Sequence, residues 1–356
     1  MSEVRAKKAL GQHFLVDLNI ARKICDALSG GVRPEAGAET RAVAAGSADA
    51  DAETRTRVAG YAGAGAEART MAAGSANAGA EARTKATGTA DADAETRRGV
   101  AASADARLAA DTTAAGAPAA AEEERGGAVP CDVLEVGCGM GVLTQFLLRR
   151  GDITTYGAEI DPESVEYLHA HFPEFAPRLI EGDFLKMNLR ERFPRGLKII
   201  GNFPYNISSQ IFFKVLEHRD LVPECVGMIQ KEVAVRIAEP PGSKEYGILS
   251  VLLQAWYDIE YLFTVNETVF NPPPKVKSAV IRLRRNSVGR LGCDEALFVK
   301  VVKASFGQRR KMIRNSLRAV FGDFGGAEHP FFTQRAEQLS VADFVQLTNW
   351  VAANRK

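Results

Sequence analysis

A short apolar run that ends in a glycine-rich turn constrains the fold more than any other feature of the sequence. Residues 131–136 read Cys-Asp-Val-Leu-Glu-Val, a pattern typical of a buried parallel strand, and glycines follow at positions 137, 139 and 141. Residues 142–150 then have helical spacing. A strand, a glycine turn and a helix together bring the backbone close to a ligand at the N-terminus of the helix. The sequence therefore predicts a ligand-binding βα unit.

The alternation of strands and helices continues along the chain. Amphipathic spacing predicts a helix over residues 19–28 and another that ends near Ile237. Further strands are expected over residues 154–160, 178–180, 197–200, 226–229, 257–265 and 278–283. This alternation indicates an α/β doubly wound sheet. After Leu291 only helical patterns remain, which indicates a small α-helical domain at the C-terminal end.

Residues 31–129 differ in composition from the rest of the chain. They contain 36 alanines, one aromatic residue and seven residues from Val, Leu, Ile, Met and Phe, and their net charge is −4 against +5 elsewhere. Five units of 14 residues repeat a glutamate, from Glu39 to Glu95, and an arginine two positions later. Burial of so little apolar surface cannot offset the chain entropy that folding would remove. We therefore expect a disordered or transiently helical insertion without a catalytic role. The expected divisions are an N-terminal arm and helix (1–30), the insertion (31–129), a sheet domain (130–288) and a helical domain (289–356).

The whole-chain composition excludes several classes of protein. With 46% hydrophobic residues the chain is neither collagen-like nor disordered throughout. The longest apolar stretch, residues 248–256, is far shorter than the roughly 18–20 residues of a membrane span, and the N-terminus lacks the apolar core of a secretory signal. Five cysteines without a C-x-x-C pair favour a reducing cytoplasm and argue against a zinc site. His169 and His171 diverge on a helix, so no metal site is expected.

Acidic residues follow the second and third predicted strands. Glu159 lies 22 residues after Gly137, at the position from which a carboxylate reaches the ribose hydroxyls of a bound cofactor. Asp183 follows the third strand, where its side chain could accept a hydrogen bond from an adenine amino group. The turn is G-x-G-x-G, not the G-x-G-x-x-G of dehydrogenases, because position 142 is valine. The pattern favours an adenosine-containing cofactor; a tight turn beside a surface carboxylate is the alternative.

The fourth predicted strand ends in Asn202-Phe203-Pro204-Tyr205, at the edge of the sheet where such folds bind ligands. The amino nitrogen of adenine is a poor nucleophile because its lone pair is delocalised into the ring. The Asn202 side-chain oxygen and the carbonyl of Phe203 or Pro204 could accept both amino hydrogens and steer the lone pair toward a sulfonium methyl. Pro204 stiffens the turn, and Tyr205 offers a face on which a base can stack. A purely structural turn is the alternative.

Residues 296–322 hold seven basic residues and no acidic one. A helix with Arg310, Arg314 and Arg318 at every fourth position would present one basic stripe, to which Arg309 and Lys311 add charge. Such a stripe neutralises phosphates without reading sequence, whereas a solvated face usually mixes both signs of charge. We therefore expect these five residues to bind RNA.

Taken together, these motifs resemble the S-adenosylmethionine-dependent rRNA adenine N6-dimethyltransferases, and specifically the small-subunit, kasugamycin-sensitivity branch. The resemblance covers nearly everything except residues 31–129. Besides the motifs above, it rests on the blocks at residues 11–15, 159–161, 182–183, 202–208, 230–233, 244–247, 270–276 and 306–317. It implies a Rossmann-like class I methyltransferase sheet and S-adenosylmethionine as the cofactor. The implied reaction is dimethylation of two adjacent adenosines near the 3′ end of small-subunit rRNA, in a pre-30S particle, by a cytoplasmic monomer.

The resemblance also implies roles for individual residues. Cofactor contacts fall on His13, Leu15, Gly137, Glu159, Asp183 and Asn202. The target adenine is surrounded by Asn202, Pro204 and Tyr205, with Phe270 as a second aromatic wall. Many relatives have Asn at position 13 and Leu or Ile at position 203, and neither departure is expected to remove activity. Two alternatives stay open: a large-subunit rRNA dimethylase of the resistance type, and a non-catalytic ribosome-assembly or transcription factor on the same fold.

Overall fold

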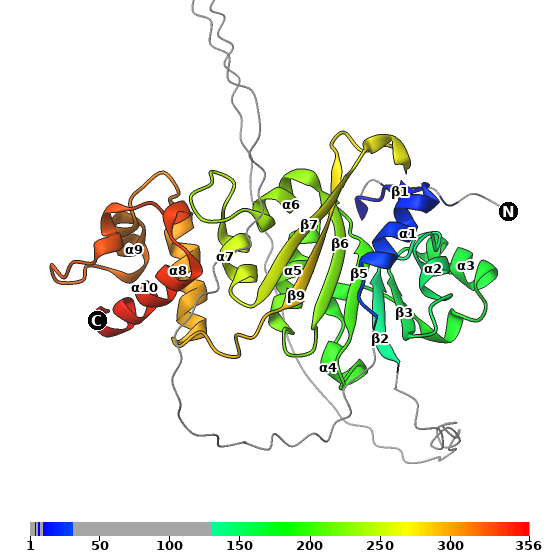
Figure 1. The fold of residues 1–356 in the computed structure, drawn as a ribbon, viewed down its shortest axis with the longest axis horizontal. Coiled ribbons are helices and arrows are strands. Elements are labelled where there is room, and N and C mark those ends of the chain that lie inside the picture. Colours follow the sequence, from blue (N-terminus) through cyan, green and yellow to red (C-terminus); the bar gives the residue numbers. More distant parts are fainter. Residues whose placement is uncertain (1–3, 5, 8–9, 31–129, 356) are drawn as a thin grey trace, which may run out of the picture. The chain divides into compact units, whose positions relative to one another are not determined.

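The computed structural model describes residues 4, 6–7, 10–30 and 130–355; the prediction for the insertion lies outside these residues. A seven-stranded sheet with the order β4-β3-β2-β5-β6-β9-β7 forms the centre of the described fold (Figure 1). Strands β4 to β6 in this order run parallel, and β9 pairs antiparallel with both β6 and β7. The strands are β2 (Cys131–Val136), β3 (Ile153–Glu159), β4 (Leu179–Glu181), β5 (Lys198–Asn202), β6 (Glu224–Gln230), β7 (Tyr257–Val265) and β9 (Ser278–Arg285).

Each strand lies within two residues of its predicted bounds, and the predicted α/β sheet is confirmed. The helices of this part are α1 (Leu18–Ala27), α2 (Thr144–Leu147), α3 (Pro162–His171), α4 (Leu189–Arg192), α5 (Ser208–Glu217), α6 (Lys231–Ala238) and α7 (Ile248–Gln254). The helix predicted over residues 142–150 is confined to α2. Positive φ angles at Gly139 and Gly141 keep the chain in turns until the helix begins.

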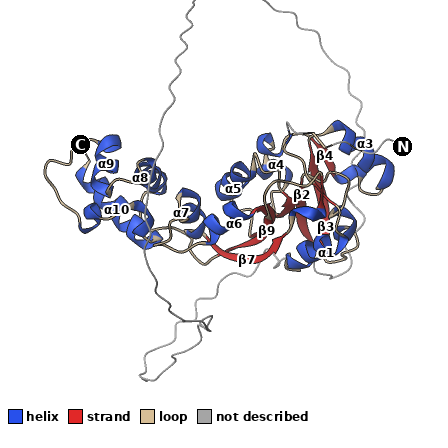
Figure 2. Ribbon diagram, turned by 90° about the horizontal axis from the view of Figure 1, so that it is seen from above, coloured by secondary structure: helices blue, strands red, loops and turns tan. Residues whose placement is uncertain are grey.

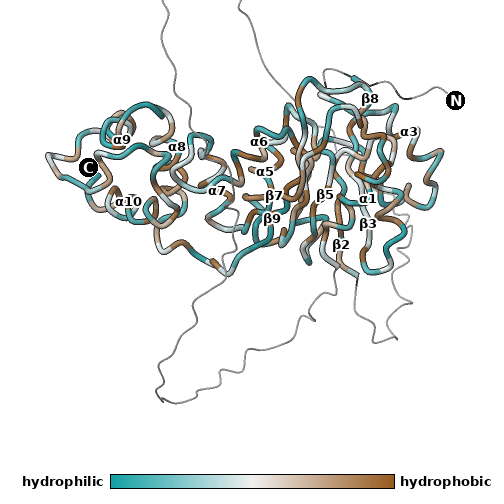
Figure 3. The backbone as a smooth tube through the Cα atoms, turned by 45° about the horizontal axis from the view of Figure 1, so that its top comes forward, coloured by the Kyte–Doolittle hydropathy of each residue, from teal (hydrophilic) through white to brown (hydrophobic). Residues whose placement is uncertain are grey.

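Alternate side chains of the central strands enter two different hydrophobic cores. Leu134 and Ile199 pack in the core that contains α5, whereas Val133 and Ile200 pack in the core that contains α1. Because successive side chains of a strand point to opposite faces, these continuous apolar runs need cover on both sides. Figure 2 shows α5 and α1 on opposite faces of the sheet, and Figure 3 shows the hydrophobic residues of the strands between them.

The C-terminal helices share a core with the sheet. They are α8 (Glu295–Gly307), α9 (Ile313–Phe321) and α10 (Val341–Asn354), and buried residues of each belong to the same cluster as those of α5 and α7. Ser340 accepts a hydrogen bond from the Asp343 amide, while the Asp343 carboxylate accepts from the Ser340 amide, which starts α10 with a capping box. None of the described helices combines the length and the apolar character that crossing a bilayer requires.

Three cationic side chains, one buried and two partly buried, fix the end of α1, close to the last described residue before the insertion. The last carbonyls of a helix have no partner within the helix. Here Arg282 donates to the Ala27 carbonyl (3.0 Å), Arg150 to that of Leu28 (3.0 Å) and Lys198 to that of Ser29 (2.8 Å). Lys198 is itself neutralised by the buried Glu224, with 3.0 Å between Nζ and Oε2.

The two described residues that flank the insertion, Gly30 and Pro130, both lie near the start of β3. Gly30 lies against the side chain of Asp152, the residue that precedes β3. The first residue of β3, Ile153, pairs with Cys131, directly after Pro130. A short loop between Gly30 and Pro130 could therefore join the N-terminal arm to the sheet.

Candidate active site

The glycine turn after β2 forms one wall of a pocket. Gly137, Gly139 and Gly141 have φ angles of 76°, 52° and 74°, which residues with a side chain rarely adopt. A Cβ atom at Gly139 would lie 3.0 Å from the ring of Phe14. The turn therefore needs glycine both for its backbone conformation and for the approach of the N-terminal arm.

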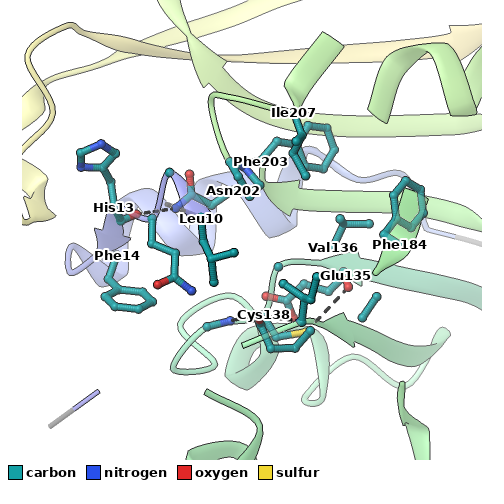
Figure 4. A pocket seen from close by; sticks show the side chains of 18 of the residues that line it. Leu10, His13, Phe14, Glu135, Val136, Cys138, Phe184, Asn202, Phe203 and Ile207 are labelled. Carbon is teal, nitrogen blue, oxygen red and sulfur yellow. Dashed lines mark hydrogen bonds between the residues drawn. The ribbon is translucent and has the colours of Figure 1, made fainter. Parts of the chain in front are cut away.

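The pocket lies at the carboxyl ends of the parallel strands, between the N-terminal arm, the glycine turn and the end of β5 (Figure 4). This is the edge at which open α/β sheets bind ligands. The pocket is lined by every residue predicted to contact the cofactor, and also by Pro204 and Tyr205. The structure thus brings together residues that are up to 192 positions apart in the sequence.

Glu159 ends β3 with a buried carboxylate that orders the rim of the pocket. One oxygen accepts from the Gly139 amide (2.8 Å), and the other accepts from the amides of Ile160 and Asp161 (2.9 Å each). Burial raises the pKa of the Glu159 carboxyl, and these amide donors oppose the rise. A carboxylate has about four acceptor positions, so one remains for a hydroxyl in the pocket.

Asp183 lies across the pocket with one oxygen free for a ligand. Its Oδ1 accepts from the Leu185 amide (2.9 Å), which caps the short 3₁₀ turn Phe184–Lys186. Its Oδ2 lies 4.0 Å from the Lys186 ammonium, too far for a direct hydrogen bond. The prediction that Asp183 could accept from an amino group is compatible with this arrangement.

Asn202 is oriented by the N-terminal arm. Its side-chain nitrogen donates to the main-chain carbonyl of His13 (2.9 Å), as Figure 4 shows. Because that carbonyl can only accept, the amide nitrogen must face it, which leaves the Asn202 side-chain oxygen with its acceptor positions unused. The neighbouring Pro204 carbonyl accepts from the Ile207 amide (3.2 Å) and keeps one lone pair.

Phe203 lines the pocket, and its ring packs in the core that contains α5. The side chain is 1% exposed and makes an edge contact with Phe212 of α5 at 5.7 Å between centroids. A Cβ atom at Gly227 would lie 2.4 Å from the Phe203 ring. A large aromatic residue therefore fits at this position because the next strand carries a glycine beside it.

The ring of Tyr205 lies beside that of His13, and both residues line the pocket. The centroids of the two rings are 5.3 Å apart. The Tyr205 hydroxyl is hydrogen-bonded to Ser278 at the start of β9, and His13 Nδ1 is hydrogen-bonded to the Pro272 carbonyl (2.9 Å). These contacts join the arm, the end of β5 and the loop before β9 around one opening.

The structure does not bring Phe270 into the pocket. Phe270 lies in β8 (Phe270–Asn271), opposite Leu15 of β1 (Phe14–Leu15), and its side chain is 3% exposed. It packs in the core that contains α1, among residues such as Val265. The ring nearest to Tyr205 at the opening is that of His13.

Sequence reasoning missed Glu135, which also lines the pocket. Its side chain is 1% exposed and accepts a hydrogen bond of 2.6 Å from the Thr144 hydroxyl. Burial raises the pKa of Glu135 to about 8, and the Thr144 hydrogen bond only partly opposes this rise. The available signal was a single carboxylate inside an otherwise apolar strand. Ile160, half exposed beside Glu159, was missed as well and has no comparable signal.

The prediction of one helix carrying Arg310, Arg314 and Arg318 is wrong. Helix α8 ends at Gly307 and α9 begins at Ile313, so Arg310 lies in the turn between them. Arg309 is also in this turn and donates to the carbonyls of Lys244 and Tyr246, which ties the turn to another loop. The turn is stabilised by these contacts in place of helix hydrogen bonds.

The charge of α9 is partly neutralised by residues that follow it. Arg314 forms an ion pair with Glu328, and Arg318 forms one with Asp323 at 3.2 Å. Arg310 and Lys311 are exposed and have no ion pair with a described carboxylate. The basic surface is therefore mixed in sign on the helix and purely basic in the turn.

This topology and a glycine turn facing two acidic strand ends define a Rossmann-like, class I S-adenosylmethionine-dependent methyltransferase fold. Residues 130–353 match the family model described as ribosomal RNA adenine dimethylase, and the chain belongs to this family.

Similar proteins of known name agree with this family. The chain is 61% identical over 218 residues to the ribosomal RNA small subunit methyltransferase A of Parabacteroides distasonis, covering 61% of this chain and 81% of that protein. The protein of the same name from Bacteroides thetaiotaomicron is 60% identical, with coverage of 62% and 82%. Among solved structures, a dimethyladenosine transferase from Plasmodium falciparum is 25% identical with a TM-score of 0.53, covering 63% of this chain and 90% of that one.

Proposed function

We propose that this protein transfers methyl groups from S-adenosylmethionine to the N6 amino groups of two adjacent adenosines near the 3′ end of small-subunit rRNA. The observation that carries the proposal is Asn202, whose unused side-chain oxygen lies at the rim of a pocket for an adenosine-containing cofactor. The names of the similar proteins support small-subunit rRNA as the substrate.

The residues of the pocket fit S-adenosylmethionine. The three glycines leave a cradle that side chains would fill, and Glu159 retains an acceptor position for a ribose hydroxyl. Asp183 would accept from the adenine amino group of the cofactor, and the exposed side chain of Ile160 would cover one face of its base. When bound, the cofactor supplies a methyl group on a positively charged sulfur, which makes that methyl electrophilic.

The chain's own residues would prepare the substrate amino group. Asn202 Oδ1 and the carbonyl of Phe203 or Pro204 would accept both amino hydrogens, so that the nitrogen becomes pyramidal and its lone pair is localised toward the methyl group. Because Asn202 is hydrogen-bonded to His13 and Pro204 to Ile207, these acceptors are held in place before the base arrives. Tyr205 would stack on the base, and Ser278 fixes its ring through the hydroxyl.

The helical domain, residues 289–356, would bind the RNA backbone. Its exposed Arg310 and Lys311 lie in the turn before α9, and Arg314 and Arg318 exchange carboxylate partners for phosphates. Arg309 would act by holding this turn in place. Exposed ion pairs contribute little stability, about 0–1 kcal/mol, so this exchange costs little.

A methylation assay with mapping of the product tests the proposal. Purified full-length protein and labelled S-adenosylmethionine are incubated with small ribosomal subunits that lack the modification, and the methylated nucleotides are located. The expected product is N6,N6-dimethyladenosine at two adjacent positions near the 3′ end. A parallel reaction contains large-subunit rRNA. Label there alone would identify the resistance type of enzyme, and binding to small subunits without label would identify an assembly factor.

A further inference from the structure

Two lysines lie next to the strand pair that holds the Tyr205 ring. Ser278, the partner of the Tyr205 hydroxyl, pairs with Gln230 across β6 and β9. Lys277 directly precedes Ser278 and Lys231 directly follows Gln230. The Lys231 amide donates to the Lys277 carbonyl at 2.9 Å, so the backbones of the two lysines are neighbours next to Ser278, whose partner Tyr205 lines the pocket.

A third lysine belongs to the same loop. Lys275 lies two residues before Lys277, and the loop between β8 and β9 that carries both is joined to the arm by the hydrogen bond from His13 to Pro272. We call Lys231, Lys275 and Lys277 the lysine cluster. Its members lie on the segments that follow β6 and precede β9, next to the Ser278 that is hydrogen-bonded to Tyr205 of the pocket.

The lysine cluster carries charge that the described protein does not neutralise. All three residues are exposed, and none has an ion pair with a described carboxylate, although Glu232 adjoins Lys231. On α9, in contrast, Arg314 and Arg318 have carboxylate partners. Positive charge without a described carboxylate partner is therefore present beside the residues that hold Tyr205 as well as in the turn before α9.

We propose that the lysine cluster binds the phosphates of the RNA strand next to the adenosine that enters the pocket. This inference rests on the proposed function. Removing a base from its stack costs free energy, so the protein must hold the backbone of that nucleotide through other contacts. Lysine ammonium groups can bind the phosphates of this backbone whatever the base sequence is. The cluster would thus position the target nucleotide, while the helical domain binds more distant RNA.

Full-length Lys275→Ala/Lys277→Ala provides the test, with Arg192→Ala/Arg195→Ala as the matched control. Arg192 and Arg195 are exposed and precede β5, at the opposite edge of the sheet from the pocket. The Kd for an RNA fragment with the two target adenosines is measured between 50 and 200 mM salt. The lysine variant should weaken binding about tenfold and lower the slope of log K against log salt by about 1.4, since each single-stranded phosphate contributes about 0.7. The control should change neither quantity.

Chemically modified RNA locates the contact. Neutral methylphosphonate linkages on either side of the target adenosines should weaken binding by the wild type and add no further loss in the lysine variant. Additive losses would overturn the proposal, because they would show that the lysines and these phosphates act independently. An unchanged salt slope in the lysine variant would overturn it as well.

The two hypotheses fail in different ways. If the proposed function were wrong, wild-type protein itself would not methylate small subunits, whether or not it bound the fragment. If only the lysine cluster were wrongly assigned, wild type would be active and the lysine variant would match the arginine control. S-adenosylmethionine affinity and melting temperature, measured for each variant, should stay at wild-type values.

Discussion

The side-chain nitrogen of Asn202 donates a hydrogen bond of 2.9 Å to the main-chain carbonyl of His13. This contact joins the end of β5 to an arm 189 positions away in the sequence, and it fixes the direction of the Asn202 side-chain oxygen. The arm therefore contributes to the orientation of the catalytic amide as well as to the wall of the pocket.

Asn202→Ala should abolish methyl transfer while leaving the fold intact, because Asn202 orients the amino group and packs no large side chain. Loss of one preorganised hydrogen-bonding group typically costs about 10²–10³ in rate. Methyl transfer to small subunits and the melting temperature are the measurements. A rate within a factor of two of wild type would contradict the mechanism.

Tyr205→Ala should slow methyl transfer by the loss of about 1–3 kcal/mol of stacking, or roughly five- to 150-fold. Tyr205→Phe keeps the ring and loses only the hydrogen bond to Ser278, so its loss should be smaller and should match that of Ser278→Ala. Single-turnover rates at saturating cofactor distinguish these cases. Equal losses in the Phe and Ala variants would show that the hydroxyl matters and stacking does not.

Most of the fold and much of the site follow from local sequence signals. The strands carry continuous apolar runs because both faces of the sheet are covered, and Glu159, Asp183 and Asn202 directly follow such runs or end them. A carboxylate or amide residue at the end of a strand can be identified from the sequence alone. Because the strands are parallel, the residues at their carboxyl ends lie close together at the same edge of the sheet.

Long-range contacts explain what the sequence did not predict. The break between α8 and α9 depends on Arg309 reaching the carbonyls of a loop 63 to 65 residues away. The ion pairs of Arg314 and Arg318 depend on the return of the chain after α9. Helix α7 shows in the sequence only as an apolar stretch, because a helix buried on nearly all sides has no polar face that would show its period.

The Glu135 carboxyl should make the stability of the cofactor-free protein depend on pH. Its pKa is raised to about 8 from the ordinary value of 4.5. The folded state therefore holds a proton that the unfolded state has released, and stability falls as pH rises from about 4.5 through about 8. Glu135→Gln keeps an acceptor for Thr144 without this ionisation. Urea unfolding at pH 5.5, 7.0 and 8.5 should show the glutamine variant gaining stability relative to wild type as pH rises; parallel curves would contradict the assignment.

The arginines of the C-terminal part should differ in their effect on RNA binding. Charge reversal of Arg310 and Arg314 should weaken RNA binding at unchanged cofactor affinity. Glu328→Gln should instead strengthen RNA binding a few-fold, because it frees Arg314 from its ion pair. Binding titrations with RNA and with S-adenosylmethionine are the paired measurements. An equal fall in cofactor affinity would show that the helical domain has been given the wrong role.

Removal of residues 31–129 should leave catalysis nearly unchanged. The end of α1 is held by residues outside the insertion, namely Arg150, Arg282 and Lys198. Gly30 also lies beside the start of β3 without the insertion. Lengthening a connection from about 8 to about 100 residues is between three and four doublings, which costs only about 2 kcal/mol of closure entropy.

A short Gly/Ser linker in place of residues 31–129 should therefore raise the melting temperature modestly, by about 2–4 °C per kcal/mol recovered. The segment carries a net charge of −4, so its removal should not lower RNA affinity. The measurements are the methylation rate on small subunits, the RNA Kd and thermal unfolding of the linker variant beside wild type. A folded linker variant that has lost methylation would show that the repeats bind the particle or a partner, and the interpretation of the segment as a disordered insertion without a catalytic role would have to be abandoned.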